Sequence, residues 1–275
     1  MSNKKKISRK PDTAGAVTLA YVHPNEVSHS WHQSIMALIG HDIAGSGRIA
    51  RGGYIAIRCG TDGLPSARNA AVLQFLEEEK AEWLFWIDTD MGFEPDIVDR
   101  LAEAAHPTER PIMGALCFSN RQVKPDGFGG YVCRPQPTIY DWARISDEKQ
   151  GFVHRQVYEP DTVTECAGTG SAAILIHRTV FEKIEAEHGP TWYNRTPEGY
   201  TDERGVRRML GEDLSFCIRA GVLGIPVHVH TGVKTTHMKT VWIAEQDYLD
   251  RWTLNSFLSQ MAEQQAEAKE TETST

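Results

Sequence analysis

Two aspartates, Asp88 and Asp90, directly follow the apolar run WLFWI at residues 83–87. In an extended segment, side chains at positions i and i+2 point to the same side, so this spacing predicts that both carboxylates converge on one object. Two carboxylates on one hard divalent cation, with phosphate oxygens and water in the remaining positions, is how Mg²⁺ or Mn²⁺ is held against a nucleotide. The alternative is a polar turn after a strand, with one aspartate capping a helix that starts near Pro95.

A second acidic pair, Glu212 and Asp213, begins the stretch GEDLSFCIRAGVLGI at 211–225, which predicts a helix ending at Gly224. A carboxylate that stays ionised at neutral pH can act as a general base toward a hydroxyl group. Acids in the first turn of a helix also favour the helix dipole, by roughly 0.3 to 1 kcal/mol. The sequence leaves both interpretations of this pair open.

Arg68 and Asn69 lie in the stretch LPSARNAAVLQFLEEEK, which predicts a helix over 64–80 with Pro65 in its first turn. Backbone N–H groups at a helix start and a guanidinium group both suit phosphate oxygens. The competing interpretation of Arg68 is a surface arginine on an amphipathic helix, and Asn69 is the weaker candidate of the two for phosphate contact.

The elements that must position these residues alternate between strand and helix. Apolar stretches predict strands at 16–23, 53–60, 83–87, 110–117, the start of 170–184, and 226–230. Helical spacing of apolar residues, or a proline at the start, predicts helices at 28–39, 64–80, 94–105, the end of 170–184, and 211–225. This alternation predicts a three-layer α/β/α fold with a mostly parallel central sheet. Residues 118–165 combine glycine, proline and aromatic residues, which indicates loops or antiparallel structure suited to substrate selection.

Composition restricts the class of protein. The chain has 275 residues, 40% of them hydrophobic, and a formal net charge of −8, which argues against a general electrostatic grip on nucleic acid. Five cysteines without a CxxC pair suit a reducing compartment, and no apolar run is long enough to cross a bilayer, so we expect a cytoplasmic protein. We expect a disordered basic tail at 1–15, one catalytic domain at 16–245, and a C-terminal helix with a disordered tail at 246–275.

The stretch WLFWIDTDMGFEPDIVDRL at 83–101 resembles the D-x-D region of GT-A-fold glycosyltransferases, especially the family 2-like enzymes of bacteria and phages. Three further stretches resemble that family in the matching order: AYVHPNEVSHSWHQSIMAL at 20–38, PSARNAAVLQFL at 65–76, and GEDLSFCIRAGVLGIPVHVH at 211–230. The resemblance spans about residues 16–240. The Asn-Arg pair that usually follows the first strand in the family is replaced here by HPNEVSHS.

The resemblance implies a metal-dependent enzyme that moves a sugar from a nucleotide-diphosphate sugar to a hydroxyl group, with Mn²⁺ or Mg²⁺ as cofactor. It implies that Asp90 binds the metal directly and that Asp88 holds the metal or the ribose hydroxyls. A histidine further along the chain is the implied third ligand. We expect His237, in a loop after the final strand, with His230 as the alternative.

The same resemblance implies roles for the remaining candidates. Asp213 is the implied base, which favours inversion of the anomeric centre, and Glu212 orients the acceptor. His23, at the end of the first strand, is the implied contact of the nucleotide sugar on that side, together with Arg68 and Asn69. The acceptor stays open between a protein side chain, a glycan or lipid-linked head group, and a modified DNA base, in a bacterial cell or a phage-infected host. The oligomeric state also stays open.

Two other classes of protein compete with a transferase. Phosphohydrolases of the haloacid dehalogenase type also place a D-x-D after an apolar strand and use an aspartate as nucleophile, although that strand usually opens their domain. A binding module that keeps a nucleotide-sugar fold without turnover is the non-enzymatic alternative.

Overall fold

The computed structural model describes residues 14–125, 131–146, 149–196, 199–201 and 207–239, together with the isolated positions Glu245, Leu249, Leu258, Ser259 and Met261. The predicted basic tail therefore lies outside the described residues except for Ala14 and Gly15, and the predicted C-terminal segment is described at isolated positions alone. The chain divides into two compact units, one of Met1–Phe118 with Pro137–Met238, the other of Ser119–Gln136 with Lys239–Thr275. Everything that follows on the site concerns the first unit.

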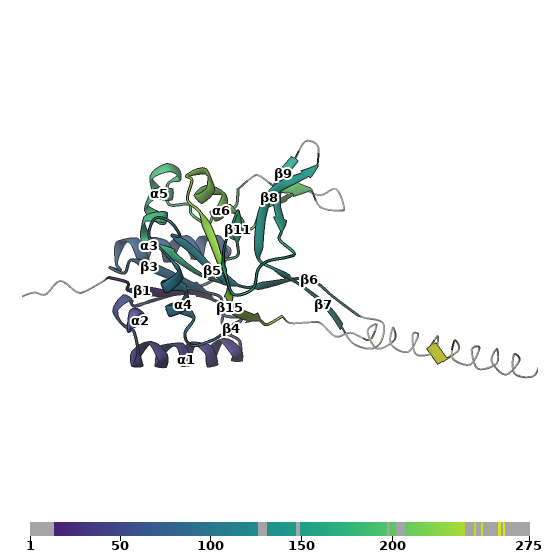
Figure 1. Ribbon diagram of the computed structural model, residues 1–275, viewed down its shortest axis with the longest axis horizontal. Coiled ribbons are helices and arrows are strands. Elements are labelled where there is room, and N and C mark those ends of the chain that lie inside the picture. Colours follow the sequence, from purple (N-terminus) through teal and green to yellow (C-terminus); the bar gives the residue numbers. More distant parts are fainter. Residues whose placement is uncertain are drawn as a thin grey trace, which may run out of the picture. The chain divides into compact units, whose positions relative to one another are not determined.

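The first unit is built on a central sheet (Figure 1). Its strand order is β10 (Val163–Cys166), β15 (Val227–His237), β5 (Ile112–Leu116), β12 (Ala173–His177), β3 (Trp83–Ile87), β1 (Val17–His23) and β2 (Tyr54–Arg58), and β4 (Met91–Phe93) pairs with β15. Strands β1, β2, β3, β5 and β15 run in one direction. Strand β12 runs antiparallel to both of its neighbours, β3 and β5. The predicted mixed α/β fold with a mostly parallel central sheet is confirmed.

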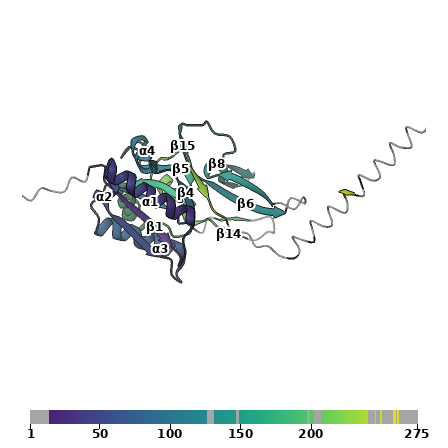
Figure 2. The same cartoon turned by 90° about the horizontal axis from the view of Figure 1, so that it is seen from below.

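Side chains of β3 alternate between two hydrophobic clusters, as the period of a strand requires. Leu84 and Trp86 pack with α3 (Gly63–Glu77), α5 (Arg178–His188) and α6 (Glu212–Val222). Trp83, Phe85 and Ile87 pack with α1 (His29–Ala44), α2 (Arg48–Gly52) and α4 (Ile97–Ala104). Figure 2 looks onto this second face, with α1 in front. Because both faces of β3 are covered by helices, all five of its residues are buried and apolar.

Local chemistry sets the bounds of α1 and α2. The Ser28 Oγ accepts a hydrogen bond from the Trp31 backbone N–H at 3.1 Å, which caps α1. Near the other end of α1, the Asp42 carboxylate accepts from the backbone N–H groups of Ile49 and Ala50 at 3.0 and 2.8 Å. The short helix α2 was not predicted, because its first turn is held by a carboxylate from the preceding helix.

The middle of the chain forms antiparallel structure, as predicted. Strands β8 (Ile139–Ser146) and β9 (Lys149–His154) pair, and β11 (Gly168–Thr169) adds to β8. Smaller pairs are β13 (Gly199–Thr201) with β14 (Arg207–Met209), and β6 (Phe118–Pro125) with β7 (Tyr131–Pro137). Among the described residues, no helix has the length and apolar character needed to cross a membrane.

Candidate functional site

The chain turns immediately after β3. The Asp88 N–H donates to the Ala172 carbonyl at 2.9 Å, and the Met91 N–H donates to the Asp88 carbonyl at 3.2 Å. The backbone across the two aspartates is therefore a turn and not an extended segment. The extended segment predicted here is wrong, and each carboxylate meets a different partner.

Asp88 faces a buried arginine. The Arg68 Nη2 donates to Asp88 Oδ1 at 2.9 Å and lies 3.8 Å from Asp213 Oδ1, while its Nε lies 4.0 Å from Glu212 Oε1. We call these four residues the Arg68 cluster. Its acids come from the end of β3 and from the first turn of α6. Arg68 itself is 1% exposed, so its interpretation as a surface arginine is wrong.

Aromatic rings and a carbonyl complete the surroundings of the guanidinium. Its carbon lies 5.2 Å from the centroid of Trp86 and 5.5 Å from that of Tyr193, within the range of cation–π attraction. The Arg68 Nη1 also donates to the Ser171 carbonyl at 3.4 Å. A buried charge is tolerated only when it is paired in this way. Sequence reasoning missed Tyr193 and Ser171, since nothing in their spacing links them to Arg68.

The Arg68 cluster holds three carboxyl groups and one guanidinium. The pKa of Asp88 is raised to about 6, chiefly by burial; the charge of Arg68 opposes this rise, and the charges of Asp213, Asp90 and Glu212 add to it. Burial, followed by the charge of Asp213, also raises the pKa of Glu212. Burial acts to lower the pKa of Arg68, but the charges of the surrounding groups, led by Asp88, outweigh it and raise that pKa overall. Perturbed acids of this kind gather at functional sites.

Asp90 faces a histidine. Strand β4 pairs antiparallel with the end of β15, with Met91 opposite His237, and the His237 Nε2 lies 2.9 Å from Asp90 Oδ2. His237 was expected in a loop. It is instead the last residue of β15, because β4 gives that strand a partner beyond its last pairing with β5.

The hydrogen bonds of His237 limit where its protons lie. Its Nδ1 is 2.9 Å from the Phe118 carbonyl oxygen, and since a carbonyl only accepts, Nδ1 carries a proton. Nε2 faces the Asp90 carboxylate at 2.9 Å. Metal-binding histidines typically donate their other ring N–H to a backbone carbonyl or carboxylate. The pair fits a divalent cation in this respect.

The structure brings together part of the predicted metal set. Among the residues it describes, no group of three or more His, Cys, Asp or Glu side chains is arranged to hold a metal ion. Asp90 and His237 meet, whereas Asp88 is directed to Arg68. Two protein ligands still match Mg²⁺-type sites, in which substrate phosphates and water fill the remaining positions.

Asn69 binds the segment that follows α5. Its Nδ2 donates to Asn194 Oδ1 at 2.7 Å, and its Oδ1 accepts from the Tyr193 N–H at 2.8 Å. Tyr193 is one of the two rings beside the Arg68 guanidinium. In this structure Asn69 therefore positions a neighbour of the Arg68 cluster.

His23 and His230 lie on different parts of the sheet. His23 is the last residue of β1, and because β1 and β3 are parallel neighbours, it lies at the same edge as Asp88. Its Nδ1 donates to the Pro24 carbonyl at 2.7 Å. His230 lies opposite Val163 of β10, away from the end of β15, and its Nδ1 accepts from the Gly232 N–H at 3.2 Å.

The chain is similar to solved structures but matches no known family model or curated sequence. No model of a known protein family matches the chain, and no curated protein sequence matches it. Among solved structures, the protein A197 from STIV is similar over 81% of this chain and 86% of its own, with 17% identity and a TM-score of 0.44. GalNAc-T7, crystallised with UDP, GalNAc and Mn²⁺, is similar over 82% of this chain, with 11% identity and a TM-score of 0.47. The chain spans 43% of that protein's length. At these scores neither similarity assigns a function.

Proposed function

We propose that this chain is a metal-dependent glycosyltransferase with a GT-A-like, three-layer fold, which moves a sugar from a nucleotide-diphosphate sugar to a hydroxyl group with inversion. The observation that supports the proposal is that Asp88 of the Arg68 cluster and Asp90 of the Asp90–His237 pair both lie just beyond the end of β3. In open α/β sheets, ligands bind beyond the carboxyl ends of the strands. Helices on both faces of the sheet agree with the three-layer arrangement.

Asp90 and His237 would hold Mn²⁺ or Mg²⁺ at this edge. When bound, the ion supplies a Lewis acid for the diphosphate leaving group. The Phe118 carbonyl fixes the imidazole so that Nε2 faces Asp90 before any ligand arrives. Such prior orientation reduces the cost of assembling the site.

Asp88 would contact the ribose hydroxyls or the ion itself. Its pKa of about 6 leaves it mostly ionised at neutral pH, and Arg68 fixes the position of one of its oxygens. His23 would lie near the nucleotide, because it ends the neighbouring strand β1. Asn69 would act by holding Tyr193 in place and would not touch the donor.

Asp213 would accept the proton of the acceptor hydroxyl. Its side chain is 31% exposed, compared with 12% for Glu212, so the acceptor can reach it more easily. Glu212 would hold Arg68 and orient the acceptor.

A phosphohydrolase of the haloacid dehalogenase type fits this geometry less well. Its nucleophile would be Asp88, the first aspartate after the strand. That carboxylate is already bound to Arg68 at 2.9 Å, which withdraws electron density from the attacking oxygen.

The test is release of nucleoside diphosphate from a panel of UDP-, GDP- and dTDP-sugars with Mn²⁺ or with EDTA. We expect Mn²⁺-dependent release from one donor, slowed by about 10²-fold or more in Asp213→Asn. The matched control is Asp99→Asn, which removes a carboxylate bound to Arg48 and His41 on the α1 and α4 side and should leave the rate unchanged. Release of inorganic phosphate, inhibited by beryllium fluoride, would instead identify a phosphohydrolase. Metal-dependent nucleotide-sugar binding without release of diphosphate would identify a binding module.

A further inference from the structure

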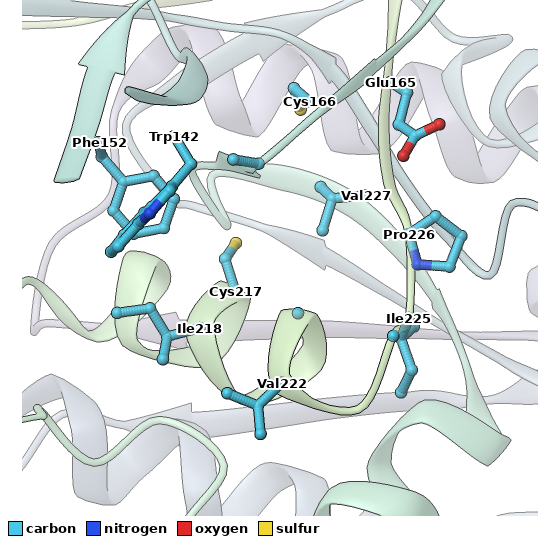
Figure 3. A pocket seen from close by; sticks show the side chains of 13 residues that line it. Trp142, Phe152, Glu165, Cys166, Cys217, Ile218, Val222, Ile225, Pro226 and Val227 are labelled. Atoms are coloured by element: carbon cyan, nitrogen blue, oxygen red, sulfur yellow. The ribbon is translucent and has the colours of Figure 1, made fainter. Parts of the chain in front are cut away.

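A cavity of about 500 Å³ lies beside α6, and none of the four residues of the Arg68 cluster lines it (Figure 3). Trp142 and Phe152 of the β8–β9 hairpin lie on one side of it, and Ile218 and Val222 of α6 form part of its lining, together with Glu165 and Val227. Its volume falls within the roughly 300–1,000 Å³ of small-molecule sites. Val227 begins β15, whereas the Asp90–His237 pair lies at the other end of that strand.

The aromatic wall of the cavity is fixed before any ligand binds. The Trp142 Nε1 donates to Gln150 Oε1 at 3.0 Å, and its ring makes an edge-to-face contact with Phe152 at 5.0 Å between centroids. Even so, Trp142 remains 49% exposed. A large ring that is held in place and left half open provides contact area at little entropic cost.

The charged group in the lining is a carboxylate. Glu165 lies in β10, and Arg155 donates to its backbone carbonyl at 2.9 Å while its guanidinium binds the Asp141 carboxylate. Among the described residues, no lysine or arginine forms an ion pair with Glu165. The residue opposite is His228, whose pKa is lowered, chiefly by burial. The carboxylate and the negative face of the indole both attract positive charge.

We propose that this cavity binds a small apolar organic cation, an alkyl or aryl ammonium ion. Its apolar body would pack against Ile218, Val222 and the Trp142 ring, and its ammonium group would approach Glu165. An uncharged apolar ligand would leave the carboxylate unused, and an anion would be repelled by it. The proposal does not depend on the transferase activity, because none of the lining residues belongs to the Arg68 cluster or to the Asp90–His237 pair.

The test uses 2-phenylethylammonium as probe and the neutral 2-phenylethanol as its matched control. Binding is followed by the NMR shift of the Trp142 indole N–H, which is assigned by its loss in Trp142→Phe. We expect the ammonium ion to bind about fivefold more tightly than the alcohol. In Glu165→Gln this preference should disappear while the affinity for the alcohol stays the same.

Two further variants complete the experiment. Trp142→Ala, followed by ligand-observed NMR, should weaken binding of the ammonium ion about tenfold. Val157→Ala changes an 85% exposed side chain that does not line the cavity and should keep the wild-type affinity. Equal affinity of the wild type for both probes, an unchanged preference in Glu165→Gln, or no shift of the Trp142 signal at millimolar probe would each overturn the proposal.

Discussion

Asp88 and Asp90 are two residues apart, yet their surroundings differ. Asp88 meets a permanent cation, Arg68, that is 1% exposed and shared with Glu212 and Asp213. Asp90 meets an imidazole, which is charged only when it is protonated. The turn after β3 therefore directs one carboxylate to a buried arginine and the other to a histidine.

The two regions also differ in how they balance charge. At Asp88, the charge of Arg68 lowers the pKa by less than burial and the nearby acids raise it, and the pKa stands at about 6. Excess charge of this kind lowers stability, and proteins retain it where function requires it. The predictions below test this difference, beginning with the largest effect.

Replacing Arg68 by methionine should destabilise the protein most. The substitution keeps much of the apolar volume but leaves the carboxylates buried without their cation, and breaking a buried pair in this way costs about 3–5 kcal/mol. The measurement is urea unfolding at pH 7. The control is Arg51→Met, which removes an exposed arginine that donates to the Gly47 and Ala14 carbonyls and should cost about 0.5 kcal/mol or less. Loss of less than 1 kcal/mol in Arg68→Met would show that the cluster does not depend on its cation.

Asp88→Asn, unlike Arg68→Met, should leave the free energy of unfolding at neutral pH unchanged or raise it. The folded-state pKa of about 6 lies above the ordinary value of 3.8, so the native state binds more protons between these values. The stabilisation from protonated Asp88 is present at pH 4 and is lost as pH rises through 6, by on the order of 2 kcal/mol. The pKa of Glu212 is also raised, so Glu212 likewise stabilises the folded protein more at low pH than at neutral pH.

The measurement is the free energy of unfolding at pH 4, 5, 6 and 7 for the wild type and Asp88→Asn. The variant should lose less stability between pH 4 and 7 and should equal or exceed the wild type at pH 7. A variant that is less stable at pH 7 by more than 1 kcal/mol would mean that the Arg68–Asp88 pair outweighs the excess charge.

The Asp90–His237 pair should respond in ligand affinity more than in stability. His237→Asn can still donate to the Phe118 carbonyl but has no atom at the position of Nε2, whereas the longer side chain of His237→Gln can reach that position. We expect Mn²⁺-dependent affinity for the nucleoside diphosphate to fall about tenfold in the asparagine variant and less in the glutamine variant. Titration calorimetry measures both. Equal affinities in the two variants and the wild type would remove His237 from the metal site.

The position of Asp88 and Asp90 at the end of β3 could be predicted, because it depends on local sequence patterns. Five consecutive apolar residues place β3, and the acids that follow it must lie at the end of the sheet. The turn after Asp88 could not be predicted, because it depends on the Ala172 carbonyl and on β4, a strand of three residues that pairs with the distant β15.

Burial of Arg68 was hidden for a similar reason. It neighbours Ala67 on α3, and nothing local distinguishes it from a solvated arginine; its partners Asp88 and Asp213 come from later strands and helices. The antiparallel direction of β12 was equally hidden, because an apolar run predicts a strand but not its direction. The burial of Arg68 and the direction of β12 thus depend on contacts between residues far apart in the sequence, which local patterns do not reveal.

The most direct test of the central claim is calorimetric titration of UDP, GDP and dTDP into the wild type, Asp90→Asn and the control Asp99→Asn, each with Mn²⁺ and with EDTA. We expect one diphosphate to bind the wild type and the control in a Mn²⁺-dependent manner, and Asp90→Asn to lose that binding while it unfolds at the wild-type urea concentration. Retained Mn²⁺-dependent binding in Asp90→Asn, or no binding of any diphosphate to the wild type, would contradict the account.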